Sequence, residues 1–210
     1  MEKAIIYIHG KNGSADEAYH YSKLFPEDKV IGFDYKANTP WEAINEFPVF
    51  FENIRKEYPN IILIANSIGA YFAINSLGNI PIEKAYFVSP IVNMENLIMS
   101  MMQWAGIDET QLRDRKNIET SFGETLSIEY LDWVRNHSVS WNIPTSILYG
   151  ANDNLQNMGD IKQFSKKYNV ELSIMNNGEH WFHTEEQMDF LDKWIYSSVK
   201  FLFLKQRRDK

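Results

Sequence analysis

Short apolar runs recur along the chain, and polar or amphipathic stretches separate them. An unbroken apolar run is typical of a strand that is covered on both faces, as in a parallel sheet. The runs therefore predict strands of this kind in several places. We expect them at residues 3–8, 29–33, 61–64, 84–89, 144–149 and 170–175.

Stretches with helical spacing lie between most of these runs. They predict helices at residues 15–25, 41–58, 159–168 and 184–204, and a further helix that directly follows the 61–64 strand. Pro48 should interrupt or kink the second of these helices. Because strands and helices alternate over short connections, we predict an α/β fold, built on a doubly wound, mainly parallel sheet of about six strands.

The alternation stops between residues 90 and 142. This stretch shows no clear strand and is rich in Met and Trp, so we expect several short helices. A structureless loop of this length would be unusual within one domain. We therefore predict a single domain over residues 1–210 with a helical insertion at about 91–142. The insertion could simply pack on the domain, or it could be a lid over a site, because Met and aromatic side chains form adaptable apolar walls.

Composition narrows the classes of function. The chain has 44% hydrophobic and 23% charged residues, a formal net charge of −7 and no cysteine. A negative chain without a basic stripe argues against nucleic acid as a partner. The absence of cysteine excludes disulfides, thiolate metal sites and a thiol nucleophile. No leader peptide or membrane-length apolar run is evident, so we expect a cytoplasmic protein without a membrane partner.

Ser67 lies where the 61–64 strand turns into a helix, between the small residues Ala65 and Gly69. Small neighbours let a strand and a helix approach closely, and the turn would expose the serine hydroxyl at the sheet edge. That hydroxyl would also lie at a helix N-terminus, which favours developing negative charge. The residues alone leave a second interpretation open, in which Ser67 only caps the helix.

Ser67, Asp153 and His180 each follow a predicted strand, so in a parallel sheet they should meet at one edge. A serine hydroxyl needs a base to become a nucleophile, histidine suits that role near neutral pH, and a carboxylate can hold the imidazole. The residues leave alternatives open. Asp153 could be a plain turn residue, His180 could be a surface histidine, and His183 could be the base instead.

These features together resemble the α/β-hydrolase superfamily. The motif HGKNGS at residues 9–14 follows the first strand, Ser67 lies in a nucleophile elbow, and Gly-x-His at 178–180 follows the last strand. The order Ser, Asp, His is also that of the superfamily. The family usually has glycine where this chain has Ala65. The strand before residues 9–14 is the first of this chain, so the resemblance implies a trimmed version of the fold.

The resemblance also implies roles for individual residues. It makes Ser67 the nucleophile, His180 rather than His183 the base, and Asp153 the acid of a triad. It places the oxyanion hole at the backbone N–H groups of Lys11 and Ile68, with the Lys11 side chain free to vary. The histidine at position 9 would be structural and would orient the oxyanion loop. The 91–142 insertion would be a lid.

The implied activity is that of a serine hydrolase that cleaves carboxylic esters through an acyl-enzyme, without a metal or cofactor. The partner would be a small-molecule ester-like substrate, with an apolar acyl or aromatic group to suit the insertion. The fold alone leaves thioester, amide or carbon–carbon bond hydrolysis open, and also a non-catalytic binding protein on the same scaffold. A phosphate-binding α/β domain is disfavoured, because neither G-x-G-x-x-G nor a Walker-type lysine motif occurs.

Overall fold

The computed structural model describes residues 3–208 of the chain, and the side chains of residues 3–198. Its centre is a six-stranded sheet with the order β2-β1-β3-β4-β7-β8. Every neighbouring pair in this sheet is parallel. The strands are β1 (Ala4–Ile8), β2 (Lys29–Gly32), β3 (Ile61–Asn66), β4 (Lys84–Val88), β7 (Thr145–Gly150) and β8 (Glu171–Met175). The predicted parallel sheet of about six strands is confirmed.

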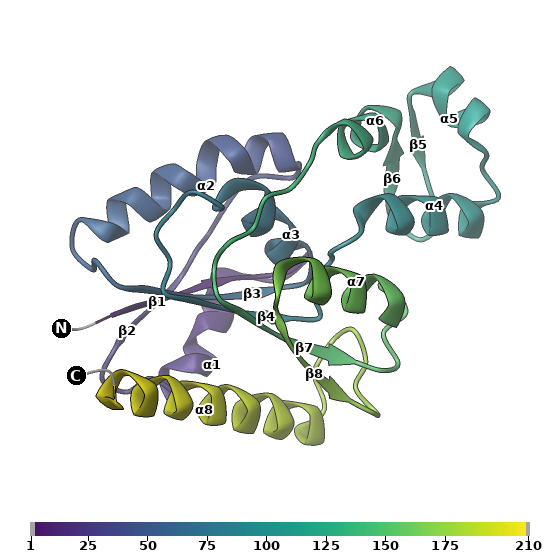
Figure 1. Ribbon diagram of the computed structural model, residues 1–210. Helices are drawn as coiled ribbons and strands as arrows, with labels where there is room; N and C mark the ends of the chain where they lie inside the picture. The colour runs from purple at the N-terminus through teal and green to yellow at the C-terminus, as the bar shows by residue number, and fades with distance from the viewer. Residues whose placement is uncertain (1–2, 209–210) are drawn as a thin grey trace.

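Helices cover both faces of the sheet, as Figure 1 shows. One face carries α2 (Pro40–Arg55), α3 (Ser67–Ser76) and α7 (Met158–Tyr168), and the other carries η1 (Ala15–Ala18), α1 (Tyr19–Ser22) and α8 (Glu185–Arg208). The sheet is therefore doubly wound, as the alternation of strands and helices predicts. Within the described residues, no helix is both long enough and apolar enough to cross a membrane.

The central strands are mostly apolar because each face of the sheet is covered. Along β3, Leu63 packs into the core under α2 and α3, and its neighbour Ile64 packs into the core above α8. All five residues of β1 and of β4 are buried. Such two-sided burial produces the continuous runs that predict strands in this sequence.

Two predicted helices differ from the structure in detail. The segment expected as one helix over residues 15–25 is a 3₁₀ turn, η1, followed by the short α1. In contrast, α2 is a single helix that continues through Pro48. A proline removes one hydrogen bond of a helix. The buried rings of Phe47 and Phe51, which are 0% exposed, anchor α2 on both sides of it.

The segment between β4 and β7 contains a hairpin as well as helices. Its elements are α4 (Met94–Ala105), α5 (Glu109–Arg115), β5 (Asn117–Glu119), β6 (Thr125–Ser127) and α6 (Ile128–Asn136). The prediction of no strand here is wrong, because β5 and β6 pair antiparallel with Ile118 opposite Leu126. Each strand has only three residues and one buried side chain, which is too short to give a recognisable alternation.

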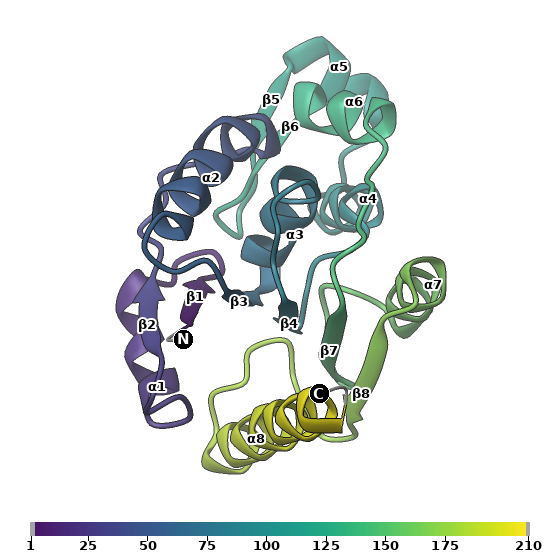
Figure 2. The ribbon, with the colours of Figure 1, turned by 60° about the vertical axis from the view of Figure 1, so that its left-hand side comes forward.

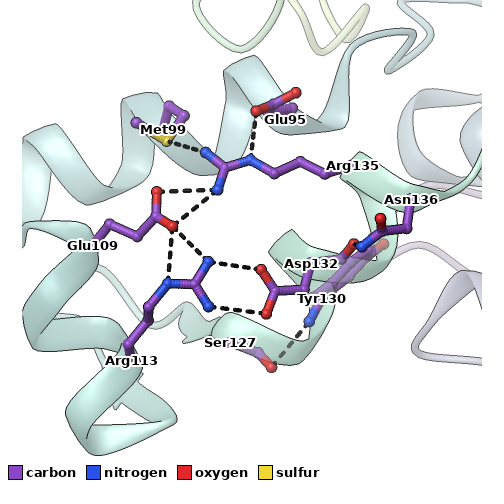
Figure 3. Close-up of polar contacts among 9 residues, drawn as sticks. All are labelled: Glu95, Met99, Glu109, Arg113, Ser127, Tyr130, Asp132, Arg135 and Asn136. Carbon is purple, nitrogen blue, oxygen red and sulfur yellow. Dashed lines mark hydrogen bonds and ion pairs between the residues drawn. The ribbon is translucent and has the colours of Figure 1, made fainter.

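These elements form a group beyond one edge of the sheet (Figures 1 and 2). Their helices are linked by two arginines (Figure 3). Arg135 of α6 binds Glu95 of α4 at 2.7 Å and Glu109 of α5 at 3.0 Å, and Arg113 of α5 binds Glu109 at 2.6 Å and Asp132 of α6 at 2.9 Å. Below, the insertion means residues 91–142.

The insertion also touches the helices on the sheet. The ring of Trp41, at the start of α2, lies 5.6 Å from that of Tyr130 and 5.9 Å from that of Trp133, both on α6. Several of the buried side chains of the insertion, among them Leu112 and Leu131, belong to the same apolar core as α2 and α3. The insertion is thus packed on the sheet domain through apolar contacts.

Candidate active site

Ser67 is the first residue of α3 and follows β3 directly. Its φ is 50°, in the left-handed region that a non-glycine residue rarely occupies. Such a conformation costs free energy and is common at functional sites. It turns the chain sharply from strand to helix, so the hydroxyl lies at the carboxyl edge of the sheet. Ala65, where the family usually has glycine, is a fully buried residue of β3 paired with Ile8 and Phe87.

Two glycines let the loop after β1 approach the turn at Ser67 closely. A Cβ on Gly69 would lie 2.3 Å from the carbonyl oxygen of His9, so the start of α3 packs directly on the backbone that follows β1. A Cβ on Gly10 would lie 3.1 Å from the Cβ of Ser67. The loop that carries HGKNGS is therefore in close contact with the elbow.

Asp153 lies in the turn after β7, and its side chain is 0% exposed. Its Oδ1 accepts hydrogen bonds from the backbone N–H groups of Leu155 at 2.8 Å and Gln156 at 3.0 Å. Asp153 is therefore a turn residue whose side chain accepts hydrogen bonds from its own turn, as one interpretation of the sequence expects. These bonds also fix the carboxylate, so that Oδ2 faces His180 at 2.8 Å.

His180 stands between the two other residues. Its Nδ1 lies 2.8 Å from Asp153 Oδ2, and its Nε2 lies 2.8 Å from Ser67 Oγ. In the tautomer whose Nδ1–H donates to Asp153, Nε2 is free to accept the proton of Ser67. The His180 side chain is 13% exposed. Residues 113 and 27 positions apart in the sequence are thus joined in one hydrogen-bonded row.

Two loops bring Asp153 and His180 together. A Cβ on Gly150 would lie 2.5 Å from the backbone of Gly178, so these two glycines are in direct contact. The N–H of Asn152 also donates to the carbonyl of Gly178 at 2.8 Å. His183 lies outside this arrangement, because its Nδ1 is 2.7 Å from the carbonyl of Trp181 and its ring stacks on that of Trp181.

The loop after β1 is held by its histidine and by Tyr35. His9 Nδ1 lies 2.8 Å from the carbonyl of Gly10, and its ring stacks on Tyr35 at 4.3 Å between centroids. The Tyr35 hydroxyl donates to the His9 carbonyl at 2.9 Å. Burial raises the pKa of Tyr35, so its hydroxyl keeps this proton. The sequence gives no sign of Tyr35, which lies in a loop 26 residues away.

The two backbone groups expected to form the oxyanion hole belong to the residues that follow Gly10 and Ser67, which approach each other closely. Ile68 is in the first turn of α3, where N–H groups have no partner within the helix. Lys11 lies in the loop after β1, beside Gly10 and its close approach to Ser67. The side chain of Lys11 forms an ion pair with Glu124 at the tip of the β5–β6 hairpin, a partner that the sequence does not predict.

A groove of about 850 Å³ opens at the other end of the strands. It is lined by Lys84, Thr145 and Glu171, the first residues of β4, β7 and β8, and by Trp194 of α8. The row of Ser67, His180 and Asp153 lies at the carboxyl ends of these strands, so the groove belongs to the opposite edge of the sheet.

No family model matches the chain. One curated relative, "Putative esterase/lipase 3" of Mycoplasma genitalium, is 36% identical over 75 residues, which cover 34% of this chain and 27% of that protein. The chain thus matches about a quarter of the length of this relative.

Solved structures match over most of the chain. Est1E of Butyrivibrio proteoclasticus has a TM-score of 0.73 at 17% identity, covering 99% of this chain and 89% of that one. The mouse alpha/beta hydrolase domain-containing protein 10 has a TM-score of 0.75 at 15% identity, covering 95% and 90%. An esterase of Pyrococcus furiosus has a TM-score of 0.62 at 21% identity, covering 92% and 81%. The agreement extends over the whole sheet and its helices, and the chain has the α/β-hydrolase fold.

Proposed function

We propose that the protein is a serine hydrolase that cleaves carboxylic esters of small molecules through an acyl-enzyme. The observation that carries this proposal is the row of hydrogen bonds from Asp153 through His180 to Ser67, with 2.8 Å at both steps. A nucleophile, a base within hydrogen-bond distance and a third group that orients the base are the parts that such catalysis requires.

The proposed reaction begins when Ser67 Oγ attacks the ester carbonyl while His180 Nε2 takes the hydroxyl proton. The negative charge on the carbonyl oxygen is stabilised by the N–H groups of Lys11 and Ile68. The tetrahedral intermediate expels the alcohol, which takes the proton from His180, and the acyl group stays on Ser67. Water then attacks the acyl group and gives its proton to His180. Collapse of the second intermediate releases the acid, and the proton returns to Ser67.

The buried carboxylate of Asp153 supports this sequence electrostatically. His180 gains a positive charge in each transition state, and Asp153 lies 2.8 Å from its Nδ1. The strained φ of 50° at Ser67 is a second supporting feature, because a nucleophile elbow holds its serine in such a turn. His183 is a poorer candidate for the base, since its Nδ1 bonds the carbonyl of Trp181.

We further propose that the insertion is a lid that contributes to substrate binding. Its hairpin tip reaches the proposed oxyanion loop through the Lys11–Glu124 ion pair. Trp104 and Phe122, whose rings meet at 6.2 Å, are 52% and 43% exposed on the insertion. Exposed aromatic side chains on this unit favour an apolar acyl or aromatic group in the substrate. Est1E, which shares the fold, has been crystallised with ferulic acid, an aromatic acid.

The cytoplasmic location stays a prediction from the sequence.

A fluorophosphonate probe and a p-nitrophenyl ester series test the proposal together. We expect the probe to label Ser67 and the esters to turn over, with Ser67→Ala losing both activities while its thermal unfolding stays close to that of the wild type. Ser76→Ala, on the last turn of the same helix, is the matched control and should remain active. Undiminished ester turnover by Ser67→Ala would remove this serine from the mechanism.

Two further comparisons sharpen the assignment. His180→Ala should abolish turnover, whereas His183→Ala should retain most of it, and the reverse result would make His183 the base. A parallel panel of thioester, anilide and β-diketone substrates asks which bond is cleaved. A folded protein that resists the probe and turns over none of the panel would be a binding protein on this scaffold.

A further inference from the structure

The side chain of Gln156 joins the loop of Asp153 to the first residues of the insertion. Gln156 is 2% exposed. Its Oε1 accepts hydrogen bonds from the backbone N–H groups of Val92 at 2.9 Å and Asn93 at 2.8 Å. Its Nε2 donates to the carbonyls of Asn93 at 3.2 Å and Leu155 at 3.0 Å. Three of these four bonds reach the chain that leads into α4.

The backbone of the same residue supports Asp153. The N–H of Gln156 donates to Asp153 Oδ1 at 3.0 Å, and the hydroxyl of Tyr149 donates to the Gln156 carbonyl at 2.8 Å. Gln156 is therefore held by Tyr149 of β7 on one side and by the insertion on the other. Continuous hydrogen bonds connect residue 92 to Asp153, His180 and Ser67.

Asp160 holds the start of α4 from a second direction. This residue is 9% exposed in the first turn of α7. Its carboxylate accepts from the side-chain amides of Asn93 at 2.9 Å and Asn96 at 3.0 Å. Asn93 in turn caps α4, because its Oδ1 accepts from the N–H of Asn96 at 3.0 Å. Among the described residues, Asp160 makes no hydrogen bond to Asp153, and Gln156 alone bonds both to Asp153 and to the residues that lead into α4.

We propose that Gln156 is a positioning residue that couples the placement of the insertion to the orientation of Asp153. This proposal rests on the proposed function, since it assigns Gln156 a part in the same site. If α4 moves away, the Gln156 amide loses three partners, and a buried amide without partners is unfavourable. The 153–156 turn then rearranges to find new partners, and the support of Asp153 Oδ1 changes with it. A seated insertion thus favours the carboxylate position that holds His180.

Gln156→Glu tests the coupling with a side chain of nearly the same shape. One oxygen of the introduced carboxyl can still accept from Val92 and Asn93, but the other faces two carbonyl oxygens. Only the protonated carboxyl can donate there. The groups around it are the carboxylates of Asp153 and Asp160, the hydroxyl of Tyr149 and, beyond Asp153, the ring of His180. Both carboxylates disfavour ionisation, so the introduced group should stay protonated in mildly acidic solution.

The readout is kcat/KM per active site, counted by fluorophosphonate titration, between pH 5 and 9. The wild type gives the reference profile. Relative to it, kcat/KM of Gln156→Glu should fall by about tenfold or more at higher pH, because small misplacements of catalytic groups are costly. Gln163→Glu, an exposed position on α7, makes the same change of charge and should follow the wild type. Equal profiles for the two variants would overturn the proposal.

Hydrogen exchange measures the link without a substrate. At pH 8, Gln156→Glu should raise exchange in residues 92–97 and 153–157 together, relative to Gln163→Glu, and a rise confined to 92–97 would overturn the coupling. Asn96→Ala removes only a contact to Asp160, so it should lower stability without causing a fall of kcat/KM at higher pH. If such a fall appears, the coupling is assigned to Asp160 instead. If the wild type resists the fluorophosphonate, the proposed function is contradicted. The coupling is then still decided by hydrogen exchange, which needs no catalytic activity.

Discussion

The rim with Ser67, His180 and Asp153 and the insertion beyond it are held by different kinds of interaction. At the rim the carboxylate is 0% exposed, and two loops meet through glycine backbone. In the insertion, α4, α5 and α6 are joined by ion pairs whose side chains are 31% to 48% exposed (Figure 3). Salt and water weaken exposed ion pairs, but they have little access to buried hydrogen bonds.

This difference suggests how the two regions share the proposed work. A triad must keep its atoms within a narrow range of distances, and buried contacts provide that. A lid must adjust to admit substrate. The exposed ion pairs between its own helices can break and re-form at small cost, while buried side chains such as Leu112 and Leu131 keep it packed on the sheet domain. Gln156 lies between the two regions. It is buried like the rim, and it bonds both to Asp153 and to the insertion. Substitutions on each side should therefore differ in the size and type of their effects.

The largest effect should come from Asp153→Asn. The amide still accepts from Leu155 and Gln156, but it presents an N–H group to His180 and favours the wrong tautomer. In serine hydrolases of this design such a change lowers kcat by about 10⁴-fold. Steady-state kinetics with a p-nitrophenyl ester measures the loss, and Asp34→Asn, an exposed aspartate, is the control. A loss below tenfold would show that the buried row does not organise the catalysis.

Gly69→Ala should damage the rim through packing rather than charge. The added Cβ would lie 2.3 Å from the His9 carbonyl and 2.8 Å from Ile8 Cγ2, so the backbone must shift. Overpacking of this kind typically costs about 1–3 kcal/mol. We expect a lower melting temperature and slower labelling by the fluorophosphonate. In Gly159→Ala the nearest atom belongs to the side chain of Asn157, so a smaller loss is expected. Equal losses for both variants would contradict the close contact of elbow and loop.

The sequence predicts the rim well because each of its residues follows a strand. Ser67, Asp153 and His180 follow parallel strands, and the carboxyl ends of such strands meet at one edge of the sheet. The HGKNGS motif likewise identifies the loop that touches Ser67. These predictions need only the positions of the strands, their parallel arrangement and the local motif, and all three follow from patterns of neighbouring residues.

The sequence does not predict the contacts that span the chain without a motif. Gln156 meets residues 92 and 93 across 64 and 63 positions, and nothing in its neighbours distinguishes it from an exposed glutamine. The β5–β6 hairpin has three residues in each strand, so its period cannot be read. The partner of Lys11 depends on where that hairpin tip folds. Such contacts follow from tertiary packing, which a pattern of local residues does not contain.

Acid should loosen the insertion before it disturbs the sheet. Hydrogen bonds from Arg113, and then from Arg135, hold the pKa of Glu109 below its ordinary value of 4.5, and Arg113 does the same for Asp132 and its ordinary 3.8. A lowered carboxyl pKa in the folded state adds stability above the ordinary value, and that stability is lost as pH falls through the lowered one. The protection factors of backbone amides, measured by hydrogen exchange from pH 6 to pH 3, should therefore fall first in residues 109–136. Earlier exchange in β1 and β3 would contradict this order.

The smallest effect should come from the tip of the insertion, where Lys11 and Glu124 pair with side chains 50% and 33% exposed. Such a pair contributes about 0.2–1 kcal/mol, so Lys11→Glu or Glu124→Lys should raise KM by at most about fivefold and leave kcat nearly unchanged. The double exchange, with both substitutions, should restore KM, because it re-forms the pair in reverse. In the wild type 0.5 M salt should act like either single substitution, and it should add little to them. If the double exchange is no better than the singles, the two side chains do not act as a pair, and the tip of the hairpin is held to the loop of Lys11 by something other than charge.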